Sequence, residues 1–224
     1  MKIPVKAIFS DAGNIIFDDR DRNTQVYEKL TYLTGIPKNN LRKLLEPYKT
    51  KAFTDKNYSY AQAWADLCDH LKLTPEQKYN IVETYKKQKS MELYPEVKET
   101  LKKIQKLKIP FIIITDAPEP ASTIENMLKR KYRLEGIAGI VSSKDIGVMK
   151  PNKQIFEKAL QQYDLKSKDV IFLAHDYDEL KGAHDLGYNV LALNYEPNGD
   201  LSFIPKSRKI KTFPELLKKI TNQG

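Results

Sequence analysis

The sequence predicts an α/β fold with a parallel β-sheet and a block of helices inserted after the first strand. Three observations predict it. Residues 5–9 form a short apolar strand pattern at the start of the chain. Residues 18–92 carry helical patterns only, and from Tyr94 onward short apolar strands alternate with amphipathic helices. Strands that alternate with helices are joined by right-handed crossovers, which leave a sheet covered on both faces.

The composition is that of an ordinary globular protein. The chain has 224 residues, 41% hydrophobic and 30% charged, enough for one large domain or for a core with an insertion. No apolar run approaches the roughly 20 residues that span a bilayer. Lys2, Pro4 and Lys6 interrupt the start of the chain, where a signal peptide would have its apolar core. Cys68 is the single cysteine, which suits a reducing compartment, so we expect a cytoplasmic protein.

The net charge is +9, from 38 basic and 29 acidic residues, and could attract anions or nucleic acid. Most lysines, however, lie at helical spacing opposite apolar positions, as in residues 101–107, which is typical of solvated helix faces. The sequence has no zinc-finger spacing and no RNA-binding aromatic motif. We therefore expect a small anionic substrate and no nucleic-acid or membrane partner, with the oligomeric state left open.

The inserted block is expected to begin with a charged loop at residues 18–22 and to continue as four helices. Residues 23–33 place apolar side chains on one helical face, and residues 41–48 repeat that spacing. Residues 59–62 resemble a capping box before the third helix. Residues 74–77 are a second capping box, with proline at the first helical position.

The remainder of the chain is expected to alternate between helices and buried strands. Its apolar runs of three to five residues are too short for helices and fit buried parallel strands. Strands are expected at residues 110–114, 139–141, 170–173 and 189–193, and helices at 95–108, 120–132, 151–163, in a short segment that stops at Gly187, and after a cap at residues 212–215.

Polar side chains follow four of these strands. Asp11 follows the first strand, Thr115 and Asp116 the second, Lys150 the third, and residues 174–179 (AHDYDE) the fourth. The carboxyl ends of parallel strands meet at one edge of a sheet, where ligands bind. A carboxylate there can attack an electrophile, while an ammonium and a hydroxyl stabilise an anion. A second acid beside Asp11 would hold Mg²⁺, which prefers oxygen ligands.

Each candidate also has a purely structural interpretation. Asp11 could form an Asx-type turn, Lys150 could sit in a loop before a proline, and Thr115 suits a strand end by its β-propensity. Asp116 is a substrate-binding candidate or a solvated loop acid. The carboxylates of residues 176–179 could be helix N-terminal acids favoured by the helix dipole. Their joint occurrence at successive strand ends favours the functional interpretation.

Five segments carry a resemblance to a known family. AIFSDAGNII, FIIITDA, GVMKPNKQIFEKAL and FLAHDYDELKGAHDLGY resemble, in this order, the four motifs of the haloacid dehalogenase-like (HAD) hydrolases. LYPEVKETLKKIQKLKIP resembles the segment that leads back from the helical cap of this family to its core. The likeness covers nearly the whole chain, and the third motif, which contains Lys150, is the most specific.

This resemblance implies a Rossmann-like core at residues 1–17 and 93–224 and a helical cap at residues 18–92. It implies a phospho-aspartyl mechanism on a small phosphorylated metabolite, with Asp11 as nucleophile, Thr115 and Lys150 as anion stabilisers, and Asp116 and Lys150 in contact with substrate. Mg²⁺ would be held by Asp11, the carbonyl of Gly13 and an acid from Asp176 to Glu179.

The first motif departs from the family pattern. Phosphatases of the family carry a second aspartate two residues after the nucleophile, where this chain has Gly13, and a glycine where it has Asn14. Since general acid catalysis is typically worth 10²–10⁴-fold, the change predicts slow hydrolysis of poor leaving groups. A shifted register would place Ser10 at the nucleophile position and leave a dead site. We favour Asp11, because DAGN followed by two apolar residues fits the motif without a gap.

The fourth motif also departs. Anchored on Gly182, its two aspartate positions fall on Ala174 and Glu179; anchored on the strand end, the first falls on His175. Asp176 or Asp178 could substitute, and these alternatives stay open at the level of sequence.

Two other functions are compatible with this motif. Haloacid dehalogenases proper use no metal and no second acid. Their fourth motif has a polar pair and an aspartate instead, and an arginine from the cap takes the halide. Asp176 and Glu179 can be laid over that pattern, and Arg42 is the candidate arginine, equally explained as a solvent-facing helix residue. The third possibility is an inactive protein that keeps the fold as a binding module.

Overall fold

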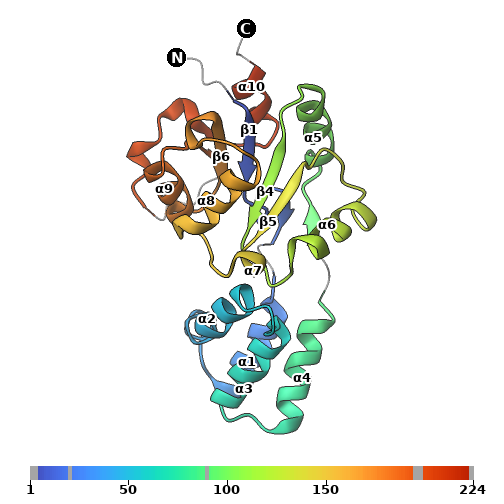
Figure 1. Cartoon of the computed structure of the whole chain (residues 1–224). Helices are drawn as coiled ribbons and strands as arrows, with labels where there is room; N and C mark the ends of the chain where they lie inside the picture. Colours follow the sequence, from blue (N-terminus) through green and yellow to red (C-terminus); the bar gives the residue numbers. More distant parts are fainter. Residues whose placement is uncertain (1–4, 20–21, 89–90, 194–198, 222–224) are drawn as a thin grey trace.

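The computed structural model describes residues 5–19, 22–88, 91–193 and 199–221 and consists of an α/β core with a helical module beside it (Figure 1). We call this module the cap. No helix in the described ranges is long and apolar enough to cross a membrane.

The core is a parallel sheet in the order β5-β4-β1-β6-β7-β8. The first strand lies between β4 and β6, with Ser10 opposite Ile113 on one side and Leu173 on the other. The parallel sheet predicted from the sequence is confirmed, while β8 was not foreseen. The strands are β1 (Ala7–Ser10), β4 (Phe111–Thr115), β5 (Gly139–Ser142), β6 (Val170–Ala174), β7 (Asn189–Leu193) and β8 (Lys209–Ile210).

Two apolar layers cover the sheet, because neighbouring side chains of a strand point to opposite faces. In β1, Ile8 belongs to one layer and Phe9 to the other. Helices α5 (Val97–Lys106), α6 (Ala121–Arg130) and α10 (Glu215–Thr221) pack on the Ile8 face. Helices α8 (Lys153–Gln162) and α9 (Tyr177–Asp185) pack on the Phe9 face. This arrangement leaves the carboxyl ends of the strands facing the cap (Figure 1).

The cap consists of four helices around its own core. They are α1 (Thr24–Thr34), α2 (Lys38–Thr54), α3 (Tyr60–His70) and α4 (Pro75–Lys86). The fully buried Trp64 and the aromatic rings packed against it fill the space between them. The capping box predicted at Thr74 is complete. The one predicted at Ser59 is half formed: the Ser59 hydroxyl accepts from the Gln62 backbone N–H, while the Gln62 side-chain amide donates to Asp66.

Two short strands connect core and cap. β2 (Phe17–Asp18) and β3 (Glu92–Leu93) pair in antiparallel orientation. The prediction of a loop at residues 18–22 is therefore wrong at Asp18, which lies in β2. The domain boundaries proposed from the sequence, after residues 17 and 92, fall within this two-stranded ribbon. A two-residue strand has no detectable period, and its pairing joins segments more than 70 residues apart.

A buried lysine in the helix α7 (Ser143–Ile146) holds the cap against the core. The Lys144 ammonium donates to the backbone carbonyls of Ala52 and Tyr58, each at 2.7 Å, and to that of Asp55. The Ser143 hydroxyl donates to the carbonyl of Phe53 at 2.9 Å. Because α7 directly follows β5, these contacts fix the end of α2 relative to the sheet.

Candidate active site

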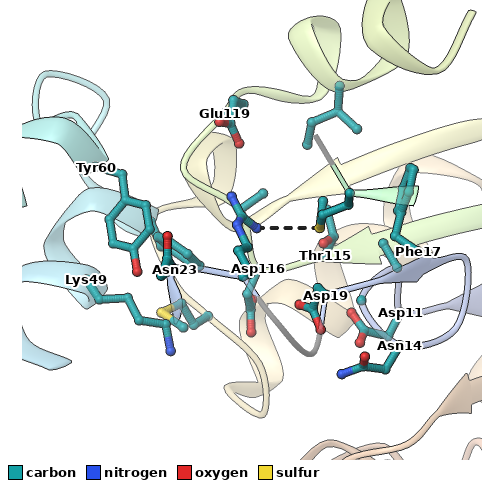
Figure 2. Close-up of a pocket in the computed structure, with 18 of the residues that line it drawn as sticks. Asp11, Asn14, Phe17, Asp19, Asn23, Lys49, Tyr60, Thr115, Asp116 and Glu119 are labelled. Atoms are coloured by element: carbon teal, nitrogen blue, oxygen red, sulfur yellow. Dashed lines mark hydrogen bonds between the residues drawn. The ribbon is translucent and has the colours of Figure 1, made fainter. Parts of the chain in front are cut away.

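A cavity of about 670 Å³ lies where the carboxyl ends of the strands meet the cap (Figure 2). Core and cap both line it. The core contributes Asp11, Gly13, Asn14, Thr115, Asp116, Met149, His175 and Glu179, and the cap contributes Tyr27, Arg42, Lys49, Phe53 and Tyr60. Three of the four predicted strand-end groups thus reach one cavity, and the fourth, Lys150, contacts Asp11 directly.

Asp11 emerges from the end of β1 as a buried carboxylate. Its backbone N–H donates to the carbonyl of Leu173 at 2.9 Å, which continues the pairing of β1 with β6 past the last strand residue. The neighbouring Ser10 is fully buried and its hydroxyl donates to the Asp11 carbonyl. Asp11 faces the cavity and Ser10 does not, so the structure supports the sequence register that places Asp11 at the nucleophile position.

Lys150 connects the two carboxylates of the site. Its ammonium lies 2.6 Å from Asp11 Oδ1 and 2.9 Å from Glu179 Oε1, and its side chain has no exposed area. Its backbone N–H donates to Asp116 Oδ1 at 3.1 Å. Asp116, expected at the substrate, lines the cavity and in addition fixes the loop that carries Lys150.

The charges of this cluster depend on one another. Burial alone would lower the pKa of Lys150, but Asp11, Glu179 and Asp116 outweigh that effect and raise it above its usual value. Burial, and after it the charge of Asp11, raises the pKa of Glu179, and Lys150 opposes this only in part. Burial also raises the pKa of Asp116. Lys150 therefore stays protonated, with its ammonium in contact with one oxygen of Asp11.

The structure selects among the alternatives for the fourth motif. His175 Nε2 lies 3.7 Å from Asp11 Oδ2, and Glu179 faces the cavity one helical turn later. Asp176 instead caps α9, accepting the backbone N–H groups of Asp178 and Glu179. Asp178 is exposed. The residues of this motif that reach the site are therefore His175 and Glu179.

The ligand set implied for Mg²⁺ does not assemble. The implied ligands are Asp11, Gly13, Asp176 and Glu179. Of these, Asp176 caps a helix, and one carboxylate oxygen of Glu179 contacts the Lys150 ammonium. Within the described residues, no group of three or more histidine, cysteine or acidic side chains is placed to hold a metal ion. An imidazole stands beside Asp11 where the resemblance implies a carboxylate, and Mg²⁺ prefers oxygen. These residues do not fit a Mg²⁺ site, which corrects the prediction that included Asp176.

Thr115 and Asn14 occupy the floor of the cavity. Thr115 is buried at the end of β4 and lines the same cavity as Asp11, and its role as an anion-stabilising hydroxyl stays a prediction. Asn14 has φ 52°, a left-handed conformation that asparagine adopts more readily than most residues. It thus substitutes for the glycine usual at this position.

Cations from the cap and its junction with the core face these carboxylates. Arg42 lines the cavity with its guanidinium 5.7 Å from the centre of the Tyr27 ring, so the candidate arginine does reach the site. Lys49 and Arg22 also line it, and Arg22 donates to the Met91 sulfur at 3.9 Å. Neither was singled out from the sequence, because their approach to the cavity depends on how the cap packs against the core.

Asp19 is a further lining residue that the sequence did not indicate. Figure 2 shows its carboxylate beside the Asp11 carboxylate and the Asn14 side-chain amide. It lies in the charged segment interpreted as a loop, and no spacing rule connects it to Asp11.

Comparisons with known proteins agree with the fold. The sequence profile of the haloacid dehalogenase-like hydrolases matches residues 14–193. The (S)-2-haloacid dehalogenase 4A of Burkholderia cepacia is 22% identical over 129 residues, which cover 57% of this chain. That match spans about half, 55%, of the length of this relative.

Solved structures of both dehalogenases and phosphatases are similar to this chain. A 2-haloacid dehalogenase from Pseudomonas syringae pv. Tomato DC3000 has a TM-score of 0.68 at 13% identity, covering 98% of this chain and 100% of the other. An HAD phosphatase from Thermococcus onnurineus has a TM-score of 0.63 at 21% identity, covering 96% and 97%. A protein described as a predicted phosphoglycolate phosphatase from Haemophilus somnus 129pt has a TM-score of 0.65 at 16% identity, covering 96% and 97%. At these identities the likeness establishes the fold alone.

Proposed function

The chain belongs to the haloacid dehalogenase-like hydrolases, and from that premise we propose that it is a hydrolase in which Asp11 forms a covalent ester without a resident divalent cation. The substrate is a small organic anion with a good leaving group on carbon, of the 2-haloacid type. The observation that carries the proposal is the surroundings of Asp11, with Lys150 Nζ at 2.6 Å from one oxygen and His175 Nε2 at 3.7 Å from the other.

The first step follows from these contacts. Lys150 stabilises Asp11 as an anion, so that an Asp11 oxygen can attack the carbon that bears the leaving group. The new bond joins Asp11 to that carbon, while the bond to the halogen breaks and the halide leaves with its electron pair. No proton is needed at this stage, which suits a chain with Gly13 in place of the usual acid.

The second step is the attack of water on the carbonyl carbon of the Asp11 ester. The bond from that carbon to the ester oxygen breaks, the product leaves as an alcohol that carries this former Asp11 oxygen, and the oxygen of water completes the regenerated Asp11 carboxyl group. Arg42 and Lys49 supply the positive charge that would attract the carboxylate of the substrate and the departing halide. The Burkholderia cepacia relative, described as a haloacid dehalogenase, is consistent with this chemistry.

A Mg²⁺-dependent phosphatase is the competing candidate. The combination of Asp11, Thr115 and Lys150 at one strand edge favours it, because a carboxylate, a hydroxyl and an ammonium suit a phosphoryl group equally well. Phosphatases also occur among the similar structures. It ranks second because the His175 imidazole lies beside Asp11 at the position where the resemblance implies a carboxylate for Mg²⁺.

The deciding experiment offers wild-type protein and its Asp11→Asn variant a panel of 2-haloacids and an activated aryl phosphate, with Mg²⁺ or with a chelator. Halide release that survives chelation and disappears in the variant supports the proposal. Phosphate release that requires Mg²⁺ and disappears in the variant supports the phosphatase instead. Absence of turnover on every substrate favours a binding module, whereas turnover unaffected by Asp11→Asn contradicts Asp11 as nucleophile.

A further inference from the structure

The volume that a side chain at position 13 would occupy contains the carboxylate of Asp19. A Cβ atom built on Gly13 would lie 2.9 Å from Asp19 Oδ2 and 3.4 Å from its carboxyl carbon. This is the position where phosphatases of the family carry their second acid. The chain thus has no acidic side chain at residue 13, yet a carboxylate reaches the same place from residue 19.

Local folding accounts for the approach. The Asn14 N–H donates to the carbonyl of Phe17 at 2.7 Å, which closes a turn after Asp11 and directs the chain back along the cavity. The pairing of β2 with β3 then fixes the segment immediately before Asp19. The side-chain amide of Asn14 donates to the Asp19 carboxylate. Turn, ribbon and hydrogen bond together position Asp19 against Gly13. Figure 2 shows the Asp19 side chain beside those of Asp11 and Asn14.

The surroundings of Asp19 suit a group that exchanges protons. Burial raises its pKa, and the charge of Asp11 acts in the same direction. Arg22, His175 and the Asn14 amide lower it, but their sum is smaller than the increase. A carboxyl whose pKa lies above its usual range accepts a proton from water more readily, and it can return that proton later.

We propose that Asp19 is the proton-transfer residue of this site and replaces, from a different point of the chain, the acid that Gly13 lacks. This rests on the proposed function, in which Asp11 carries a covalent ester.

The step it performs is the hydrolysis of that ester. The Asp19 carboxylate takes a proton from the water molecule whose oxygen attacks the carbonyl carbon of Asp11. When the bond from the Asp11 carbonyl carbon to the ester oxygen breaks, protonated Asp19 gives its proton to the departing alkoxide, which leaves as the alcohol. Asp11 emerges as a carboxylic acid and loses its proton to solvent, so one substrate and one water yield alcohol, halide and a proton.

The test separates formation of the ester from its hydrolysis. Asp19→Asn keeps the shape of the side chain but cannot accept the proton. With 2-chloropropionate under single-turnover conditions, we expect intact-protein mass spectrometry to find the Asp11 adduct formed at a rate near that of wild type. Its breakdown should be about 10²–10⁴-fold slower, so that the adduct accumulates. Asp178→Asn, at an exposed acid of the same core, is the matched control and should leave both rates unchanged.

A relocation variant tests whether position or identity matters. In Gly13→Asp alone, the new side chain collides with Asp19, whereas Gly13→Asp combined with Asp19→Gly places one carboxylate in the shared volume. We expect the double variant to hydrolyse the adduct at least 10-fold faster than Asp19→Asn, because it again has a carboxylate that can transfer the proton. If Asp19→Asn does not fold, the rate of adduct breakdown in the double variant is measured against that of wild type.

Three results overturn the inference. The first is breakdown of the adduct in Asp19→Asn at the wild-type rate. The second is an equal decrease in the rates of adduct formation and breakdown in an Asp19→Asn protein that melts like wild type. The third is a double variant that breaks down the adduct no faster than Asp19→Asn. If wild-type protein forms no adduct, or Asp11→Asn still turns over, the proposed function itself fails and the inference fails with it. Failure confined to the Asp19 variants leaves the role of Asp11 intact.

Discussion

Lys150 Nζ lies 2.6 Å from Asp11 Oδ1, although 139 residues separate the two in the chain, and the lysine side chain has no exposed area. An ammonium withdrawn from water requires a nearby negative charge, and a buried carboxylate requires a cation. Each residue therefore makes the burial of the other possible. Their pairing at the end of β1 leaves one Asp11 oxygen directed toward the cavity.

Removal of Lys150 is expected to destabilise the protein strongly. Lys150→Met leaves Asp11 and Glu179 buried without their cation, and breaking such a pair costs about 3–5 kcal/mol. Urea denaturation measures the loss. Lys153→Met is the control, because Lys153 pairs with Glu157 at 3.9 Å in an exposed position and should cost less than about 1 kcal/mol. Equal losses in both variants would contradict the buried pair.

Glu179→Gln is expected to stabilise the protein increasingly as the pH rises. The pKa of Glu179 in the folded protein lies above its ordinary value of 4.5, so the folded state retains a proton that the unfolded state releases. Stability is thus lost as the pH rises from 4.5 through the folded pKa, and a glutamine, always neutral, avoids the loss. Melting temperatures of variant and wild type from roughly pH 5 to pH 8 measure the effect. A constant difference across that range would refute it.

Lys144→Met is expected to loosen the cap. The ammonium holds three backbone carbonyls of the segment from α2 to α3, and unmade buried hydrogen bonds cost about 1–3 kcal/mol each. Hydrogen exchange should increase in residues 52–58 while the sheet stays protected. Lys56→Met removes an exposed lysine from the same segment and should leave exchange unchanged. Unaltered exchange in Lys144→Met would show that other contacts hold the cap.

His175→Asp is expected to create Mg²⁺ affinity. The substitution places a carboxylate beside Asp11 at the position where the family motif has an acid, and two oxygen donors of like charge bind a hard cation. Titration calorimetry should detect Mg²⁺ binding to the variant at least 10-fold tighter than to wild type. His184→Asp, at an exposed histidine of α9, is the control. If wild-type protein bound Mg²⁺ as tightly as His175→Asp, the conclusion that the residues around Asp11 do not fit Mg²⁺ would be wrong.

Several elements could be predicted because their signals are local. The apolar run of β4 is too short for a helix, and the Thr74 capping box begins α4 as expected. Among the elements that escaped prediction are β2, β3, β8 and α7. Each has two to four residues, too few for a hydrophobic period, and the strands exist only through pairing with distant segments.

The sequence by itself determined the architecture and the order of the strand ends, and with them that Asp11, Thr115 and Lys150 would approach one another. Parallel strands share a direction, so residues at their carboxyl ends must gather at one edge. Only the tertiary structure decided that His175 and Glu179 face Asp11, that Asp176 caps a helix instead, and that Asp19 fills the space beside Gly13. The direction of a side chain after a strand end depends on loop conformation and on packing between distant segments, and neither leaves a periodic trace in the sequence.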